Sequence, residues 1–341
     1  MASCTGQFRA PGNAHTPDFF RERTRREAMK PQEVERVAII GAGVMGHSIA
    51  QVFAHAGIEV NLVDLGQAIL DQAMQRVKGN LKTLVDAGRM GADETAAVMD
   101  RIHPNPEIQS AARDVDFALE AVVEVPDVKK EVFRQLEEFC PAGVVLASNT
   151  SSLDIFNIIE VKDPSRLVVA HWFAPPHVIP LVEIAPGPKT SPEVLAFTAA
   201  LMKRIGKHPL VMKQFVQGHI VNRIQNVIAS AVMEMLINGW ATPQEIDLAV
   251  KMSLGIRLPI VGVAQTLDFT GLKLLHDITS GLGMTIPLID EKIKQGHLGV
   301  STSKGIYDYG GRSEEEILRD RDSLYLKMLD HMEKIGAFKP V

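Results

Sequence analysis

Apolar residues in this chain follow two alternating patterns, short continuous runs and longer stretches with a three- to four-residue repeat. The continuous runs have the length of buried strands and lie at 37–40, 58–63, 116–122, 144–147, 167–170, 181–184 and 209–212. The repeating stretches are typical of amphipathic helices and lie at 44–53, 67–87, 126–139 and 191–205. Strands that alternate with helices predict an α/β fold built on a doubly wound, mostly parallel sheet.

The pattern changes near residue 217, after which helical periodicity continues without further strands. Helical stretches are predicted at 219–237, 242–254, 259–295 and 313–334. Two of them begin with a capping box, formed by Thr242 with Glu245 and by Ser313 with Glu316. We therefore predict that an all-α C-terminal domain follows the α/β domain. The predicted segments are an N-terminal extension at 1–33, the α/β domain at 34–214 and the helical domain at 215–335.

The composition is that of a soluble globular protein: 46% of the 341 residues are hydrophobic, 23% are charged and the net charge is −5. Without a basic stripe, nucleic acid is not an expected partner. Cys4 and Cys140 are the only cysteines, which favours a reducing compartment such as the cytoplasm and no metal site. No apolar run reaches the ~20 residues of a membrane span. The extension is expected to be poorly ordered, with a short charged helix over 18–28.

The first apolar run leads into a glycine-rich turn, G-A-G-V-M-G, at residues 41–46. Gly41 allows the tight turn, Gly43 lets a pyrophosphate approach the backbone, and Gly46 lets the following helix pack on the strand. Asp64 ends the second apolar run, 18 residues after Gly46, where a carboxylate binds ribose hydroxyls and repels a 2′-phosphate. The pattern predicts a Rossmann-like domain that binds NAD rather than NADP; the alternative is a glycine-rich turn without a ligand.

A candidate proton acceptor lies at the end of a later strand. His171 ends the run L-V-V-A-H, and Glu183 lies in the run P-L-V-E-I twelve residues on. If the two runs are neighbours in the sheet, the carboxylate and the imidazole pair and the histidine is equipped to take a proton from an alcohol. The alternative is a histidine that only packs or faces solvent.

Two further polar groups are candidates for orienting a substrate. Ser151 belongs to the cluster S-N-T-S-S that follows the strand at 144–147, and Ser152 beside it is expected to cap the next helix. Asn222 lies on the first helix of the C-terminal domain. Its amide either reaches a substrate oxygen or makes a capping or inter-domain hydrogen bond.

The chain resembles the NAD-dependent 3-hydroxyacyl-CoA dehydrogenase family over about residues 34–310. The motifs that carry the resemblance are G-A-G-V-M-G, E-A-V-V-E, S-N-T-S-S-L, H-W-F-A-P-P-H-V-I-P-L-V-E, G-H-I-V-N-R and K-G-I-Y-D-Y. The resemblance implies that His171 is the base paired with Glu183, that Ser151 and Asn222 contribute to catalysis, and that the helical domain forms a homodimer. With the contacts that the resemblance adds, the predicted NAD-binding residues are Gly41, Gly43, Val44, Met45, Gly46, Asp64, Glu124, Lys129 and Ser151.

Several positions depart from the family pattern. Ala174 replaces an asparagine three residues after the histidine, and Ser301 replaces a lysine that contacts NAD. Asn80 and Ala87 replace a serine and a lysine of members that bind fatty acyl-CoA. The segment L-G-I-R-L-P, which contains Arg257, is similar to that of relatives that oxidise free hydroxy acids. An arginine there could hold a substrate carboxylate bidentately. The alternative is that Arg257 forms an ion pair at the surface or between helices.

Three functions follow from these patterns. The leading hypothesis is an NAD-dependent oxidation of a 3-hydroxyacyl-CoA, as in fatty acid metabolism. The second keeps the chemistry but changes the substrate. The substrate is then a free hydroxy acid, as in gulonate and carnitine dehydrogenases, or a hydroxymethyl aromatic carboxylate. Ala174 and Arg257 motivate this hypothesis. The third is an NAD-binding protein without catalysis. No metal is expected in any of the three.

Overall fold

The computed structural model describes residues 30–340, so the extension and the helix expected at 18–28 lie outside the described part of the chain. The chain divides into two compact units, Met1–Gln225 and Asn226–Val341. The boundary falls inside helix α8 (Val221–Ile237), and each unit is described by itself.

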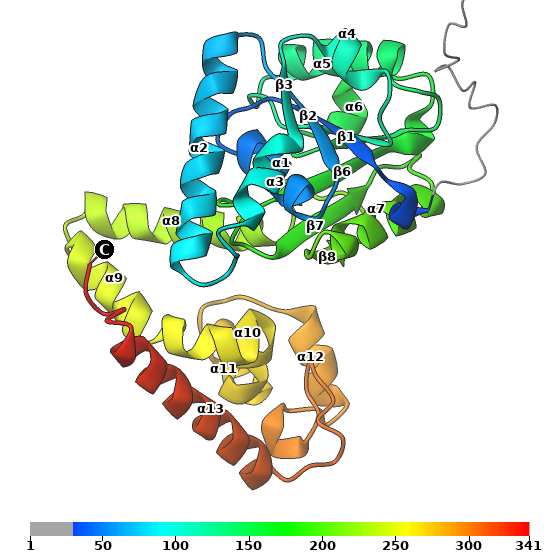
Figure 1. Ribbon diagram of the computed structural model, residues 1–341. Coiled ribbons are helices and arrows are strands. Elements are labelled where there is room, and N and C mark those ends of the chain that lie inside the picture. Colours follow the sequence, from blue (N-terminus) through cyan, green and yellow to red (C-terminus); the bar gives the residue numbers. More distant parts are fainter. Residues whose placement is uncertain (1–29, 341) are drawn as a thin grey trace, which may run out of the picture. The chain divides into compact units, whose positions relative to one another are not determined.

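The first unit contains an eight-stranded sheet in the order β3-β2-β1-β4-β5-β6-β7-β8 (Figure 1). The strands are β1 (Arg36–Ile40), β2 (Glu59–Val63), β3 (Ile102–Asn105), β4 (Phe117–Glu120), β5 (Val145–Ser148), β6 (Leu167–Trp172), β7 (Leu181–Pro186) and β8 (His208–Val211). All neighbours are parallel except β6 and β7, which confirms the predicted mostly parallel sheet. The strand order reverses beside β1, and ligands of such sheets bind at this switch point.

Helices cover both faces of the sheet because successive strand residues point to opposite sides. Val37 and Ile39 of β1 belong to one hydrophobic core, and Ala38 and Ile40 to the other. The first core is completed by α1 (Gly46–His55), α2 (Gln67–Asp86), α3 (Glu94–Asp100) and α7 (Pro192–Arg204). The second is completed by α4 (Ile108–Ala112), α5 (Pro126–Phe139) and α6 (Ile155–Ile158). This layered arrangement brings the carboxyl ends of the parallel strands to one edge.

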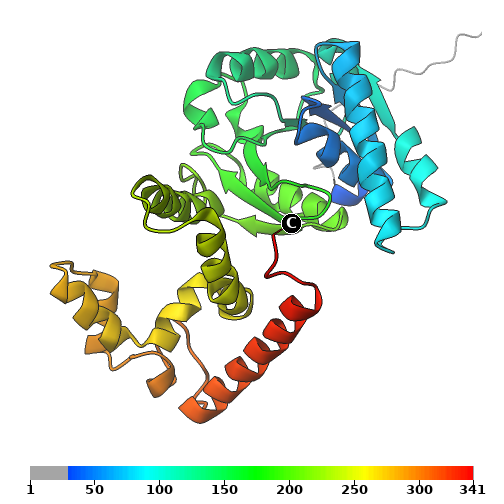
Figure 2. The same cartoon turned by 90° about the vertical axis from the view of Figure 1, so that its left-hand side faces the viewer.

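The described residues of the second unit contain helices and no named strand, as predicted (Figure 2). Its helices beyond α8 are α9 (Pro243–Met252), α10 (Leu254–Thr270), α11 (Leu272–Gly281), α12 (Pro287–Lys294) and α13 (Glu314–Lys334). The capping boxes of Thr242 with Glu245 and of Ser313 with Glu316 are both confirmed. Short 3₁₀ helices lie in the first unit at η1 (Pro31–Glu33) and η2 (Pro164–Arg166), and in the second unit at η3 (Val300–Thr302).

Helices α3 and α4, strand β3 and the three 3₁₀ helices were not predicted from the sequence. Strand β3 has only four residues, I-H-P-N, and one of them is a proline at the edge of the sheet. Helix α4 has five residues. Neither is long enough to show a periodicity of its own.

The described residues, 30–340, show neither a cluster of metal-binding side chains nor a single helix that could span a membrane. No group of three or more His, Cys, Asp or Glu side chains is placed to hold a metal ion. No single described helix is both long and apolar enough to cross a membrane, although the bent pair α10 and α11 is long and apolar enough when the two helices are taken together.

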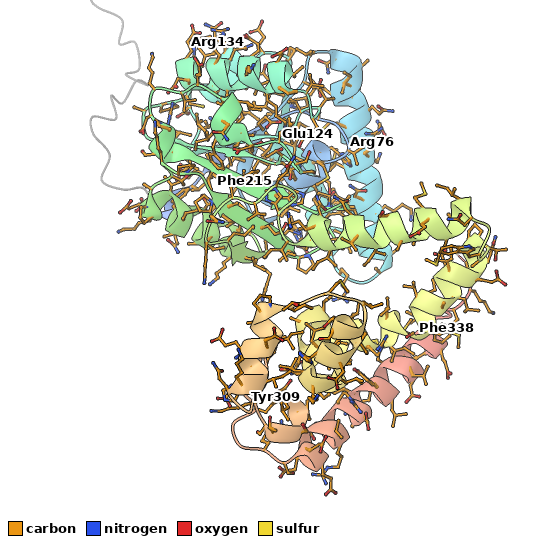
Figure 3. The ribbon with its side chains drawn as sticks, turned by 180° about the vertical axis from the view of Figure 1, so that it is seen from behind. Arg76, Glu124, Arg134, Phe215, Tyr309 and Phe338 are labelled. Atoms are coloured by element: carbon orange, nitrogen blue, oxygen red, sulfur yellow. The ribbon has the colours of Figure 1, made fainter. Side chains whose placement is uncertain are left out.

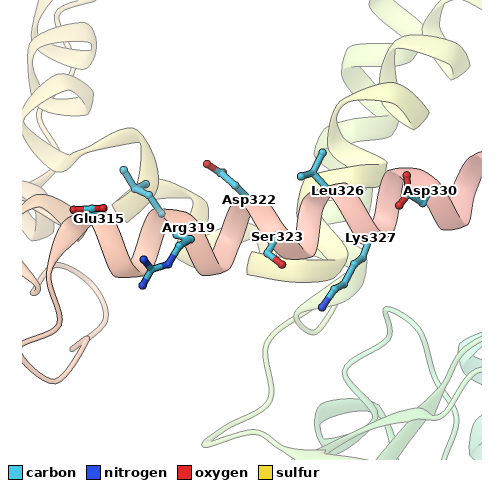
Figure 4. A pocket seen from close by; sticks show the side chains of 8 residues that line it. Glu315, Arg319, Asp322, Ser323, Leu326, Lys327 and Asp330 are labelled. Carbon is cyan, nitrogen blue, oxygen red and sulfur yellow. The ribbon is translucent and has the colours of Figure 1, made fainter.

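A surface hollow of about 700 Å³ lies along α13, which supplies all its lining side chains (Figure 4). These side chains are Glu315, Leu318, Arg319, Asp322, Ser323, Leu326, Lys327 and Asp330.

One buried carboxylate links α10 to the loop at 299–309. Asp268 accepts hydrogen bonds from the backbone N–H groups of Ile306 at 2.8 Å and Tyr307 at 2.9 Å, and from the hydroxyl of Tyr309 at 3.1 Å. Tyr309 is labelled in Figure 3. The carboxylate therefore satisfies donors that would otherwise be buried without an acceptor.

We expect Asp268→Ala to lower the free energy of unfolding of the second unit by about 2–3 kcal/mol, because three donors lose a charged acceptor. Urea unfolding followed by circular dichroism measures the change. Asp247→Ala is the matched control, since Asp247 is exposed on α9 and its side chain makes no hydrogen bond or ion pair within residues 30–340. Equal unfolding midpoints for the two variants would contradict this role of Asp268.

Candidate active site

The turn between β1 and α1 is held by its glycines. Gly41 has a φ of +103°, and a Cβ there would lie 2.6 Å from the carbonyl oxygen of Ala121. A Cβ on Gly46 would lie 1.6 Å from the carbonyl oxygen of Gly41. A Cβ on Gly43 would meet nothing within 4 Å. Packing therefore requires glycine at 41 and 46, whereas the backbone at Gly43 faces open space that a ligand can approach.

Asp64 is fixed beside this turn at the carboxyl end of β2. Its Oδ2 accepts the N–H of Ala42 at 2.8 Å, and its Oδ1 accepts the N–H of Leu65 at 2.7 Å. Val44 in the turn is 68% exposed, and Met45 is the residue before the first turn of α1. An exposed backbone, a helix N-terminus and a nearby carboxylate together fit the pyrophosphate and ribose of a dinucleotide.

The imidazole of His171 and the carboxylate of Glu183 form a buried pair. The two residues lie directly opposite each other in the antiparallel register of β6 and β7. His171 Nδ1 lies 3.0 Å from Glu183 Oε2, and both side chains are at most 3% exposed. The predicted pairing is confirmed as a contact; the role of the histidine as a base stays a prediction.

Glu183 is also bound by the start of α8. Its Oε1 accepts the backbone N–H groups of Ile220 and Val221, both at 3.0 Å. Burial by itself raises the pKa of the Glu183 carboxyl, but the His171 ring and these two N–H groups outweigh it and hold the pKa below its usual value. Because a carboxylate accepts the hydrogen bond at Nδ1, the proton of the neutral His171 ring lies on Nδ1. Nε2 then carries the lone pair.

Nε2 of His171 is open. It makes no hydrogen bond to any residue between 30 and 340. It is not one of the fully buried nitrogen and oxygen atoms that lack a partner, so part of its surface is accessible. Phe173 packs edge-on against the ring, with centroids 4.6 Å apart. The ring is thus held on two sides while one nitrogen remains accessible.

The loop after β5 is organised by Glu124, which is labelled in Figure 3. Its Oε1 accepts the Thr150 hydroxyl at 2.5 Å and the backbone N–H groups of Ser151 at 2.9 Å and Ser152 at 3.0 Å. Burial alone raises the pKa of Glu124, but the Thr150 hydroxyl and the Lys129 ammonium bring it to about 2. The carboxylate is therefore charged at neutral pH and fixes the Ser151 backbone.

Lys129 lies beneath this loop rather than on its surface. Its side chain is 0% exposed, and Nζ lies 2.7 Å from Glu120 Oε1 and 3.1 Å from Glu124 Oε2. Glu120 also accepts the Ser148 hydroxyl at 2.6 Å. A direct contact of Lys129 with NAD stays a prediction, and in this structure the ammonium binds the two carboxylates.

The expected capping role of Ser152 is wrong. The residue before α6 is Asp154, whose side chain accepts the N–H of Phe156. Ser152 lies two positions too early, and its backbone N–H is bound by Glu124 instead. Ser151 and Ser152 are both exposed at the end of β5.

Asn222 comes close to the same loop. Its Nδ2 donates to the carbonyl oxygen of Ser151 at 3.4 Å, so the structure brings these two predicted residues together. Of the predicted residues in the first unit, Asp64 lies at the glycine turn, and His171, Glu183, Ser151, Asn222 and Glu124 share the hydrogen-bond network of the strand ends.

Both domain models of one family match the chain. The model of the 3-hydroxyacyl-CoA dehydrogenase NAD binding domain matches residues 36–215, and that of the C-terminal domain matches residues 218–309. The chain belongs to the 3-hydroxyacyl-CoA dehydrogenase family. This family consists of NAD-dependent oxidoreductases, and the cofactor is NAD.

Relatives differ in the substrates that their names state. A probable 3-hydroxybutyryl-CoA dehydrogenase of Bacillus subtilis is 32% identical over 286 residues, which cover 81% of this chain and 98% of that protein. An L-carnitine dehydrogenase of Streptomyces coelicolor is 33% identical over 242 residues, which cover 71% of this chain and 75% of that protein. A solved 3-hydroxyacyl-CoA dehydrogenase of Archaeoglobus fulgidus is 28% identical, with a TM-score of 0.71 and coverage of 88% and 99%.

Arg257 belongs to the second unit, in α10. Its Nη2 donates to the Ser253 hydroxyl at 3.1 Å, and its Nε is buried without a partner. It forms no ion pair with any residue between 30 and 340, so the ion pair that the sequence left open is not seen there.

Sequence reasoning missed several polar residues of the candidate site. Asn149 accepts the backbone N–H of Trp172 at 2.8 Å and so ties the end of β6 to the loop after β5. Ser48 on α1 bonds His177 Nδ1 at 2.8 Å, which ties the first turn of α1 to the loop after β6. His219 stacks on His171. The motifs S-N-T-S-S-L and G-H-I-V-N-R contain two of these residues and were the available signal.

We expect Asp64→Asn to weaken NAD binding about tenfold and to narrow the preference for NAD over NADP, because a charged hydrogen-bond acceptor is lost and a 2′-phosphate is no longer repelled. Isothermal titration calorimetry with each dinucleotide measures both effects. Asp100→Asn is the control, since Asp100 is exposed and precedes β3, at the amino edge of the sheet. Unchanged affinity for both dinucleotides in Asp64→Asn would remove Asp64 from the site.

Proposed function

We propose that this protein oxidises a secondary hydroxyl group to a ketone with NAD, using His171 as the general base and Glu183 as its partner. The contact that carries the proposal is the 3.0 Å pairing of His171 Nδ1 with a Glu183 carboxylate held by two backbone N–H groups. This arrangement fixes the tautomer and leaves Nε2 as the proton acceptor.

Proton transfer is the part of the reaction that this chain performs. His171 Nε2 takes the hydroxyl proton, and Glu183 stabilises the imidazolium that forms. NAD, when bound, accepts the hydride from the carbon that carries the hydroxyl group. In the reverse direction the imidazolium returns the proton to the ketone oxygen. Since one proton is released per oxidation, rising pH favours the oxidised product.

Ser151 and Asn222 are proposed to orient the substrate oxygens. The 3.4 Å contact between the Asn222 amide and the Ser151 carbonyl keeps the two residues together. Glu124 supports them by holding the Ser151 backbone. Correct orientation of the hydroxyl group toward His171 is worth as much as the base itself, because misplacement by ~1 Å costs about 10²-fold in rate.

The first candidate substrate is a 3-hydroxyacyl-CoA, which the family and the Bacillus subtilis relative favour. The second is a free hydroxy acid or a hydroxymethyl aromatic carboxylate, which the L-carnitine dehydrogenase relative and Arg257 favour. The specific observation is that the Arg257 guanidinium has no anionic partner between residues 30 and 340. A guanidinium binds a carboxylate bidentately.

A homodimer formed through the helical unit is also proposed. Helix α8 has no buried residue, and several of its large apolar side chains are exposed: Val227 by 71%, Met233 by 59% and Ile237 by 82%. Exposed apolar surface on one element is typical of an interface.

We expect His171→Ala to lower kcat by about 10²–10⁴-fold while the affinity for NAD is unchanged, because only the proton acceptor is lost. NADH formation at 340 nm gives kcat, and calorimetry gives the affinity for NAD. His208→Ala is the control, since His208 is an exposed strand residue whose side chain makes no hydrogen bond within the described chain. Wild-type turnover in His171→Ala would end the assignment of the base.

Arg257→Met separates the two substrate classes. If the substrate is a free acid, the KM for that acid rises about 10–100-fold with the loss of a bidentate ion pair, and the KM for 3-hydroxybutyryl-CoA is unaffected. A panel of free hydroxy acids and CoA thioesters, assayed with Arg257→Met and the exposed control Arg319→Met, measures this. An unchanged KM for every free acid that the wild type oxidises would exclude a carboxylate-binding role for Arg257.

A further inference from the structure

The turn before α8 places a second imidazole against the proposed base. Gly218 and His219 both have positive φ values, +77° and +50°, and they fold the chain back so that the His219 ring stacks on His171. The ring centroids are 4.7 Å apart and the ring planes are inclined by 30°. His219 is 0% exposed, and Phe215 packs edge-on against its other side at 5.6 Å. Phe215 is labelled in Figure 3.

The hydrogen bond of His219 fixes its tautomer. Nε2 lies 3.1 Å from the carbonyl oxygen of Thr150. Since a carbonyl only accepts, the proton is on Nε2 and Nδ1 carries a lone pair. That Nδ1 is buried and has no partner between residues 30 and 340. Burial lowers the pKa of His219, and the neighbouring His171 lowers it further against the opposing effect of the Thr150 carbonyl.

A histidine at this position has two unfavourable features. A non-glycine residue at φ +50° is strained, and the buried Nδ1 lacks a hydrogen bond. A phenylalanine would stack on His171 without leaving a polar atom unpaired. What the imidazole adds is the Nε2–H bond to Thr150, the residue before Ser151.

We propose that His219 is a positioning residue for the reaction assigned to His171. Its neutral ring holds the plane of the His171 ring, and its Nε2–H group fixes the Thr150 carbonyl and, through it, Ser151. The same turn carries Ile220 and Val221, whose N–H groups bind Glu183. One short segment therefore orients the base, the partner of the base and the loop that presents Ser151. This inference rests on the proposed function of His171.

The two contacts predict two separable kinetic effects. His219→Phe keeps the stacked ring but removes the bond to Thr150, so kcat stays within about threefold of the wild type and the KM for the hydroxy substrate rises about 3–10-fold. His219→Ala removes the ring as well, so kcat also falls about 10–100-fold because His171 loses its orientation. The affinity for NAD changes less than about threefold in either variant, because Asp64 and the glycine turn are unaltered. His219→Leu, of similar volume and without a ring, follows His219→Ala and replaces it if the alanine variant does not fold.

A kcat and KM of wild-type size in His219→Ala or His219→Leu would overturn the proposal. So would a kcat in His219→Phe that falls as far as in His219→Leu, because the stacked ring would then have no effect. A general loss of stability, seen as an equal fall in thermal unfolding temperature and NAD affinity in all variants, would also overturn it.

A second measurement does not depend on turnover. The titratable groups that face His219 are His171 on β6, Glu183 on β7 and Glu124 in the loop after β4. In ¹⁵N NMR spectra of the wild-type protein at about pH 8, above the ordinary pKa of a histidine, His219 is expected to be the neutral Nε2–H tautomer. A charged ring or an Nδ1–H tautomer would overturn the proposal. If the wild type oxidises no substrate while His219 shows the expected tautomer, the proposed function fails and the structural assignment of His219 stands.

Discussion

The carboxylate of Glu183 is the group on which the arrangement of the site depends. One oxygen binds the ring of His171 on the neighbouring strand, and the other binds two N–H groups at the start of α8. A buried carboxylate is costly unless all its oxygens have donors, so loss of either set would destabilise the other. The register of β6 and β7, the tautomer of His171 and the start of α8 are thereby set by a single side chain.

A second carboxylate, Glu124, has the same role for the loop after β5. It collects the Thr150 hydroxyl and the N–H groups of Ser151 and Ser152, while the buried Lys129 balances its charge from below. These hydrogen bonds and the ion pair with Lys129 together stabilise the conformation of the loop after β5 seen in the structure. His219 connects the two systems, since its ring lies on His171 and its Nε2–H binds Thr150.

The sequence allowed prediction of those parts of the site that depend on local pattern. The glycine turn, Asp64 at a strand end and the His171–Glu183 pair follow from strand length and spacing, and each was found at its predicted position. Strand β3 and helix α4 were missed because a four-residue edge strand and a five-residue helix carry too little periodicity. Helix α3 was missed because Val98 is the one buried residue of its seven, so it has no apolar repeat. The role of His219 was missed because it depends on a left-handed turn and a tertiary stack, which a lone histidine in G-H-I-V-N-R does not reveal. The capping role of Ser152 was wrong because Asp154 competes for the same helix start.

The residues proposed for the chemistry and the residue proposed for the choice of substrate belong to different units of the chain. The groups proposed for proton transfer, His171 and Glu183, lie in the first unit and are tied to their neighbours by hydrogen bonds. Arg257 lies in the second unit and carries a charge that no described residue neutralises. A half-buried guanidinium without an anion gains more from a carboxylate than an exposed one does, because less of its attraction is screened by water. This favours the helical unit as the place where members with the same catalytic pair come to differ in substrate.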